Sequence, residues 1–262
     1  MPDYDFLDVE YEGNTAFIAF NRPDSLNALS SAMSKELLHA LQTAGESARA
    51  VVLTGRGKSF SSGADLSEGG FTMDDAERDI GKNLDEVFNP IIQQMRDMPV
   101  PTVTAVKGAA AGVGCAIALM GDIIVAGENA YFLQAFCNIG LVPDGGSAYI
   151  LSRSIGRVRA MEMMLLGERY AARQAYEDGL VTKLVADHEV ETTAQQIAAK
   201  LAHGPTRAYS LIRKSAWAAL DSSLDEQLHR ERLLQREAGQ TTDFVEGVTA
   251  FLNKRAPDFK GR

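Results

Sequence analysis

Two glycine-rich segments could place backbone N–H groups against a bound ligand. They are Phe60–Leu66 and Gly108–Cys115, and each follows an apolar, strand-like stretch. Small residues let a ligand approach the backbone closely, and the first N–H groups of a helix have no partner within it. Two such N–H groups from different loops can hold one oxygen atom as it gains negative charge. Taken singly, each segment is more simply explained by tight packing of a helix on a strand.

Acid–base chemistry in this chain falls to carboxylates. The 262 residues include 35 Asp and Glu, 26 Lys and Arg and only 4 His, which gives a net charge of −9. The histidines form no H-x-x-x-H pair and two cysteines cannot make a four-thiolate site, so we expect no metal. The negative charge argues against nucleic acid as a partner, because phosphate binding needs a basic footprint.

Three familiar motifs are incomplete. Gly57-Lys58-Ser59 resembles the end of a phosphate-binding loop, but the glycine required earlier in that motif is replaced by Val52. Gly55 and Gly57 lack the third glycine of a dinucleotide-binding fingerprint, because position 60 is Phe60. No G-x-S-x-G segment supports a serine hydrolase. These three classes of site are therefore excluded.

Alternating strands and helices must position the glycine-rich segments. Apolar alternation on both sides of Gly13 predicts an N-terminal hairpin. Apolar residues spaced four apart predict an amphipathic helix from Ser31 to about Ala44. Short apolar runs predict strands at Ala50–Leu53, Thr102–Val106 and Asp122–Ala126, and a buried helix at Cys115–Met120. This alternation is typical of an α/β core.

The chain becomes helical after Leu141. Gly204-Pro205 is a predicted joint, with Pro205 in the first turn of a helix. It divides the chain into a core, residues 1–203, and a C-terminal helical region, residues 204–262. Ser223–Glu226 fits a capping box. The last helix carries an apolar stripe that includes Phe251, which we expect to pack in the core.

Two features bear on location. The acidic N-terminal residues do not resemble a signal peptide. The apolar stretch Gly108–Gly121 is shorter than the roughly 20 residues that a membrane-spanning helix needs. We therefore expect a cytoplasmic protein without a membrane partner.

Short segments along nearly the whole chain together match one known family. They are Asn21–Pro23, Leu26–Leu29, Ser62–Asp65, Pro101–Gly108, Gly121–Ile124, Arg159–Met164, Gly179–Val181 and Phe251–Arg255. The chain thereby resembles the crotonase superfamily, also called the enoyl-CoA hydratase/isomerase family. The resemblance implies a spiral of repeated ββα units with a C-terminal helical region that forms trimers or pairs of trimers. It also implies an acyl-CoA thioester as the substrate, with no further cofactor.

The resemblance assigns roles to several of these residues. The family stabilises a thioester enolate with two backbone N–H groups, and the matching positions are Ala64 and Val113. Val113 stands where glycine is common, but only its N–H is needed. Leu26, Asp65 and Leu66 match residues that bind the substrate, although a helix N-cap remains open as the role of Asp65.

Two glutamates that the hydratases of this family use are missing. The matching positions carry Ala116 and Phe136, and the resemblance makes Phe136 a substrate-binding residue. Adding water across a double bond needs groups that activate the water and deliver a proton. Ordinary hydratase activity is therefore not expected.

One carboxylate remains at a position that the family uses. Asp144 lies in Gly140–Ser147 and matches the working carboxylate of several isomerases of the family. Local sequence alone favours a turn followed by a helix N-cap. A single carboxylate suffices for a 1,3-proton shift through an enolate. We expect apolar neighbours to raise its pKa by desolvation, namely Phe132, Phe136, Ile139 and Leu141.

The subfamily is indicated by two segments. Leu141–Gly146 and Phe88–Ile92 look most like the phenylacetate-pathway isomerases, which rearrange ring-epoxidised phenylacetyl-CoA and move enoyl double bonds. The dehalogenases of the family use the matching Asp as a nucleophile, with a Trp and a His in the preceding segment. Residues 134–138 contain neither, so dehalogenation is disfavoured.

The C-terminal end carries a second implied contact. Phe251 and Lys254 match positions that reach the adenine and phosphates of CoA, usually from a neighbouring subunit. A solvated basic end that complements the helix dipole is the other interpretation of Lys254.

The sequence thus predicts an acyl-CoA isomerase with Asp144 as acid and base. One alternative is an enoyl-CoA hydratase or another enolate-forming lyase. A second is a non-catalytic homologue that binds acyl-CoA or RNA. The segment Glu68–Val87 is expected to line or cover the acyl pocket.

Overall fold

A six-stranded sheet forms the centre of the molecule. The computed structural model describes residues 3–68 and 79–262. The strand order is β1 (Leu7–Glu12), β2 (Thr15–Phe20), β3 (Ala50–Gly55), β4 (Thr102–Val106), β6 (Ile123–Gly127) and β9 (Lys183–Val185). β1 and β2 form the predicted antiparallel hairpin, and the other neighbours pair in parallel. β3 and β4 are buried throughout because helices cover both faces.

A second, smaller sheet supplies the second strand of each repeated strand–strand–helix unit. It contains β5 (Ala109–Ala111), β7 (Tyr131–Leu133) and β8 (Tyr170–Ala171). β4 is followed by β5 and a helix, and β6 is followed by β7 and a helical segment. The sequence did not predict β5: we expected the glycine-rich run after β4 to lead directly into a helix. Its three alanines form a strand because β7 is available to pair with them.

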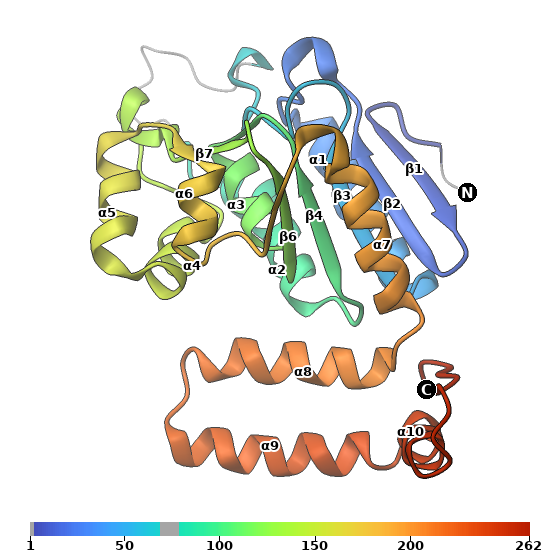
Figure 1. Ribbon diagram of the computed structural model, residues 1–262. Helices are drawn as coiled ribbons and strands as arrows, with labels where there is room; N and C mark the ends of the chain where they lie inside the picture. Colours follow the sequence, from blue (N-terminus) through green and yellow to red (C-terminus); the bar gives the residue numbers. More distant parts are fainter. Residues whose placement is uncertain (1–2, 69–78) are drawn as a thin grey trace.

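Helices cover the main sheet on both faces (Figure 1). One face carries α1 (Ser31–Ser47), α2 (Asn89–Asp97) and α3 (Val113–Leu119), and α2 is preceded by a π-helical turn, η3 (Leu84–Phe88). The other face carries α7 (Val190–Ala202), whose buried alanines pack on β3, β4 and β6. The mixed α/β architecture predicted from the sequence is thereby confirmed.

A helical flank lies beside the smaller sheet, at the left of Figure 1. It contains η4 (Ala135–Ile139), α4 (Ser147–Ser154), α5 (Gly156–Leu166) and α6 (Ala172–Glu177). Short helical turns occur at η1 (Pro23–Ser25), η2 (Leu66–Glu68) and η5 (Asp187–Glu189). Asp144 lies in the segment between η4 and α4, so these two elements of the flank position its carboxylate.

The C-terminal helices form a layer beneath the sheet. α8 (Thr206–Ala219) and α9 (Leu224–Ala238) lie side by side, and α10 (Thr242–Leu252) crosses their end (Figure 1). Pro205 is the N-cap of α8 rather than a residue of its first turn. Ser223 and Glu226 form the predicted capping box at the start of α9. Arg213 of α8 holds this layer to the core through a contact with Asp122 at 2.7 Å.

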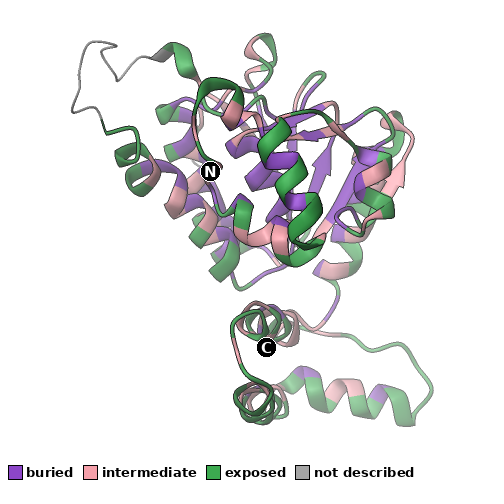
Figure 2. Cartoon of the chain, turned by 90° about the vertical axis from the view of Figure 1, so that its left-hand side faces the viewer, coloured by how far each residue is buried: buried purple, intermediate pink, exposed green. Residues whose placement is uncertain are grey.

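The apolar stripe of α10 is exposed in the single chain. Figure 2 shows the strands of the core in the buried colour and the C-terminal helices largely in the exposed colour. Phe251 is 81% exposed, and the buried residues of α10 are Asp243 and Ala250. The prediction that Phe251 packs in the core is therefore wrong for the single chain. None of the helices that the structure describes is long and apolar enough to cross a membrane.

Candidate active site

The loop after β3 presents the N–H of Ala64 away from its nearest neighbour. Ala64 pairs with Leu29 in an isolated parallel bridge. The N–H of Leu29 donates to the carbonyl of Gly63 at 2.8 Å, and the N–H of Asp65 donates to the carbonyl of Leu29 at 3.0 Å. Since these flanking groups point toward Leu29, the N–H of Ala64 points to the opposite side. It has no acceptor among the residues that the structure describes.

The N–H of Val113 is a second group without an acceptor among residues 3–68 and 79–262. Val113 is the first residue of α3, so its N–H has no carbonyl of its own helix to bind. Gly112 before it has φ 53° and ψ −132°, a conformation that essentially only glycine adopts. Its N–H donates to the carbonyl of Leu133 at 2.9 Å, which fixes the turn on β7.

The two loops meet. A Cβ atom on Gly63 would lie 2.8 Å from the carbonyl oxygen of Ala111 and 3.5 Å from the Cα of Gly112. Ala64 directly follows Gly63, and Val113 directly follows Gly112. The structure therefore brings the two N–H groups that the sequence singled out into one region. Glycine at 63 is required both by this approach and by its φ of 97°.

Asp144 stands in a turn beside the same region. Its carbonyl accepts the N–H of Ser147 at 3.0 Å. The N-cap of α4 is Gly146, with no side-chain cap, so the capping role that local sequence favours for Asp144 does not occur. Its Oδ1 is buried without a hydrogen-bond partner among the described residues. Desolvation raises the pKa of Asp144 to about 6.

The turn of Asp144 contacts the residues around Val113. A Cβ on Gly145 would lie 2.6 Å from the Cβ of Ala116, 3.6 Å from Val113 and 3.8 Å from the Cδ1 of Ile92. The sequence paired Phe88–Ile92 with Leu141–Gly146 only as indicators of the subfamily, and it did not predict that Ile92 lies against the turn of Asp144.

The two positions that the resemblance matches to the hydratase glutamates are apolar and buried. Ala116 is fully buried, and Phe136 is buried with its Cζ 3.9 Å from the place of a Cβ on Gly112. Of the other expected apolar neighbours, Phe132 is buried but Ile139 is 55% exposed. Desolvation of Asp144 by Ile139 stays a prediction.

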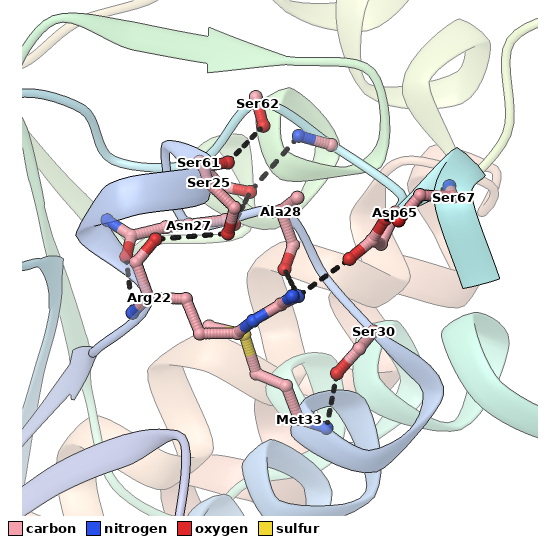
Figure 3. Close-up of polar contacts among 11 residues, drawn as sticks. Arg22, Ser25, Asn27, Ala28, Ser30, Met33, Ser61, Ser62, Asp65 and Ser67 are labelled. Atoms are coloured by element: carbon pink, nitrogen blue, oxygen red, sulfur yellow. Dashed lines mark hydrogen bonds and ion pairs between the residues drawn. The ribbon is translucent and has the colours of Figure 1, made fainter.

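Asp65 is committed to the structure of its own loop (Figure 3). Its carboxylate accepts the N–H of Ser67 at 3.1 Å and the hydroxyl of Ser67 at 2.6 Å, and pairs with Arg22 at 2.9 Å. The Ser67 hydroxyl, followed by Arg22, holds the pKa of Asp65 below its ordinary value. Leu26 and Leu66 beside this loop are largely exposed, at 47% and 58%.

Phe251 and Lys254 lie away from these loops. Figure 1 places α10 in the lower layer, whereas the loop that leads to η2 runs at the upper end of the molecule. The chain therefore does not bring these two residues to its own Ala64 and Val113. Of the segment Glu68–Val87, residues 69–78 lie outside the described residues.

A separate cleft of about 650 Å³ lies between α2, α4 and α8. Ile92 and Gly146 line it, so it begins behind the turn that carries Asp144. Ala64, Val113 and Asp144 do not line it. Among the residues of ranges 3–68 and 79–262, no group of three or more His, Cys, Asp or Glu side chains could hold a metal ion.

Comparison with known proteins identifies the family. Residues 10–262 match the family described as enoyl-CoA hydratase/isomerase. The chain belongs to this family, as the resemblance in its sequence predicted.

Similar proteins are named for different activities. A Rhodobacter capsulatus protein named "probable enoyl-CoA hydratase" is 43% identical over 263 residues, 99% of each chain. The 1,2-epoxyphenylacetyl-CoA isomerase of Escherichia coli is 38% identical over 260 residues, 98% of this chain and 99% of that protein.

Solved structures confirm the fold. A crystal structure of an enoyl-CoA hydratase from Bacillus anthracis has a TM-score of 0.90 at 30% identity, covering 98% of this chain and 100% of the other. One from Polaromonas sp. JS666 has a TM-score of 0.88 at 30% identity, covering 97% and 99%. The crotonase-type α/β fold predicted from the sequence is confirmed.

Proposed function

We propose that the protein is an acyl-CoA isomerase that moves a double bond through a thioester enolate. One observation carries the proposal: the Oδ1 of Asp144 is buried beside the Val113 region with no hydrogen-bond partner among the described residues, while the two positions of the hydratase glutamates are Ala116 and Phe136. A 1,3-proton shift needs one group that takes and returns a proton. Water addition needs more than this site offers.

The reaction uses the site's groups in sequence. The Asp144 carboxylate takes a proton from the carbon next to the thioester, and the electron pair moves onto the thioester oxygen. The N–H groups of Ala64 and Val113 hold that oxygen while it is negative. The Asp144 carboxylic acid then returns the proton two carbons further along, and the thioester carbonyl re-forms. A pKa near 6 makes Asp144 a stronger base than an ordinary aspartate.

The substrate class follows from the relatives. The E. coli relative is named for 1,2-epoxyphenylacetyl-CoA, and rearrangement of a substrate of that type is the second activity that we propose for the same groups. Phe136 and Ile92 offer apolar surface to either an alkyl or an aryl group beside the thioester.

An enoyl-CoA hydratase is the second candidate, because the R. capsulatus relative carries that name.

Purified protein with a 3-enoyl-CoA should produce the conjugated 2-enoyl-CoA, and the ultraviolet absorbance of this product measures the rate. Crotonyl-CoA in the same assay should lose absorbance slowly or not at all. Hydration as fast as isomerisation would favour the hydratase, and full isomerase activity in Asp144→Asn would contradict the proposed base.

A non-catalytic role is the remaining alternative. Binding of acyl-CoA without turnover would support it, and tight, salt-sensitive RNA binding would support an RNA-binding homologue despite the net charge of −9. Action in the cytoplasm stays a prediction.

Residues 204–262 are proposed to be the region that assembles trimers or pairs of trimers. The outward faces of α9 and α10 carry large apolar residues, among them Leu224, Phe244, Val245 and Phe251, each more than half exposed. A neighbouring subunit would cover them and would receive Phe251 and Lys254 near its own acyl-CoA. The substrate's phosphates would thereby meet basic residues in a chain that is acidic overall.

A further inference from the structure

Ser61 belongs to the loop that carries Ala64 and contacts the segment that leads to Val113. It is fully buried. Its N–H donates to the carbonyl of Ala109 at 3.0 Å, and its carbonyl accepts the N–H of Ala111 at 2.9 Å. The backbone of Ser61 therefore ties the loop after β3 to β5, two to four residues before Val113.

The hydroxyl of Ser61 adds a second set of contacts (Figure 3). It donates to the carbonyl of Asn27 at 2.8 Å and accepts the N–H of Gly63 at 3.2 Å. A Cβ on Gly114 would lie 2.7 Å from this hydroxyl oxygen. One buried oxygen thus touches the residue before Ala64 and the residue after Val113.

The partner of this hydroxyl is itself held firmly. Asn27 is fully buried, with φ 56°. Its side chain accepts the N–H of Arg22 at 2.9 Å and donates to the carbonyls of Arg56 at 2.9 Å and Ser59 at 2.8 Å. Because Asn27 is fixed on both sides, the Ser61 hydroxyl bonded to it has a fixed place.

We propose that Ser61 is a positioning residue that sets the distance between the N–H groups of Ala64 and Val113. This inference rests on the proposed function, since it assumes that those two groups hold one oxygen. Such donors stabilise a developing charge only where they already point at it, so a small displacement weakens them. Without the hydroxyl, the N–H of Gly63 loses its buried acceptor and the Ala64 peptide loses its support.

Ser61→Ala tests this role, and the neighbour Ser62→Ala is the matched control. Ser62 is exposed, and its hydroxyl only donates to the carbonyl of Ser25 at 3.3 Å. We expect Ser61→Ala to lower kcat for isomerisation of a 3-enoyl-CoA about tenfold, below the loss seen when an oxyanion donor is removed outright. KM should change by less than about twofold, because a donor that acts on developing charge contributes little to substrate binding. Ser62→Ala should match the wild type in both.

A spectroscopic probe separates positioning from a general structural role. Bound acetoacetyl-CoA forms an enolate whose near-ultraviolet absorbance reports how well the site stabilises negative oxygen. Ser61→Ala should reduce that absorbance while thermal unfolding and CoA thioester binding stay close to those of Ser62→Ala. Ser61→Cys, which keeps a weak donor and acceptor, should recover part of it.

Two failures are distinguishable. A wild-type protein with neither isomerase turnover nor an enolate signal would overturn the proposed function, and the inference would fall with it. An active wild type with unchanged kcat and enolate signal in Ser61→Ala would overturn the positioning role alone. Equal losses in kcat, substrate binding and thermal stability would also overturn it, in favour of a structural role.

Discussion

Gly145 lies directly against Ala116, so closely that a Cβ on the glycine would stand 2.6 Å from the Cβ of the alanine. Ala116 belongs to α3, whose first residue is Val113, and Gly145 follows Asp144. This contact therefore sets the carboxyl of Asp144 relative to the N–H of Val113. It also occupies the space beside position 116, which the resemblance matches to a glutamate of the hydratases.

Gly145→Ala should disturb the contact between Gly145 and Ala116. The new Cβ would meet both Ala116 and a φ of 57°, so the turn that carries Asp144 must move. We expect an overpacking loss of about 1–3 kcal/mol in the free energy of unfolding, beyond the backbone strain, and a lower kcat. Denaturant unfolding and the isomerase assay measure the two effects.

Gly140→Ala is the matched control for that substitution. Gly140 has φ 74° with nothing within 4 Å of an added Cβ. It should show only the strain of a left-handed alanine, about 1 kcal/mol. Equal losses of unfolding free energy and kcat in the two variants would mean that the contact with Ala116 does not position the turn of Asp144.

The rate should depend on the protonation of Asp144. Since burial raises its pKa to about 6, kcat/KM should be constant above pH 7 and fall with decreasing pH below about 6, as the base becomes protonated. CoA phosphate groups also titrate near pH 6, so a pantetheine thioester without phosphates is the control substrate. A profile for that substrate that stays flat to pH 4.5 would rule out Asp144 as the base.

The same carboxyl should make stability depend on pH. Its pKa is 3.8 in an ordinary setting and about 6 in the folded chain, so the folded state binds the proton more tightly than the unfolded state does. Burial of the charge therefore destabilises the protein above pH 6, and this penalty decreases as the pH falls from about 6 to about 4 and is lost below the unfolded pKa of 3.8.

Asp144→Asn should accordingly be more stable than the wild type at pH 7.5, by about 3 kcal/mol. The difference should become small near pH 4, where the carboxyl is neutral in the folded state and only partly ionised in the unfolded state. Guanidinium unfolding at the two pH values measures it. An equal difference at both would show that packing, rather than charge, separates the two proteins.

Much of this site was accessible from sequence because it depends on short-range patterns and ordered motifs. The hairpin around Gly13, the helix from Ser31 and the strand Thr102–Val106 have alternation or spacing that few other structures share. The prediction that Ala64, Val113 and Asp144 share one site came from the family resemblance, since local sequence alone favoured a helix N-cap role for Asp144.

Other features could not be predicted, for physical reasons. Three alanines become β5 only because β7 pairs with them, and no alternation marks such a strand. The contact of Ile92 with Gly145 joins chain segments about fifty residues apart. The stripe of α10 shows that the helix is amphipathic, but a pattern within one helix does not say whether its own chain or another one covers it.

Arg213 should be essential for attaching the C-terminal layer. It is 6% exposed, its Nε donates to both oxygens of Asp122 at 2.7 and 2.8 Å, and its other nitrogens donate to the carbonyls of Met95 and Met98. Burial raises the pKa of Asp122, and Arg213 opposes that rise. Arg213→Met leaves a poorly solvated carboxylate and two carbonyls without their donor, which should cost about 3–5 kcal/mol.

Lys214→Met is the control for Arg213→Met. Lys214 is the next residue of α8 and is exposed. Its replacement should change the free energy of unfolding by less than about 0.5 kcal/mol. Similar unfolding curves for the two variants would show that the buried arginine does not hold the layer.

The outward face of α10 should be an interface between copies of the chain. Val245 and Val248 are 61% and 43% exposed and flank Phe244 on one side of the helix. Charges placed there would have to be desolvated in an assembly, so Val245→Asp with Val248→Asp should dissociate it. Sedimentation should give three or six times 28.3 kDa for the wild type and a smaller mass for the variant.

Thr249→Asp is the control on the same helix, since Thr249 is also exposed but polar. It should keep the wild-type mass.

In the dissociated variant KM for an acyl-CoA should rise, because Phe251 and Lys254 would no longer reach a neighbour's substrate, while KM for a pantetheine thioester should change less. A wild-type protein that sediments as a monomer at micromolar concentration would refute the interface, and an unchanged KM after dissociation would refute the contact of these two residues with CoA.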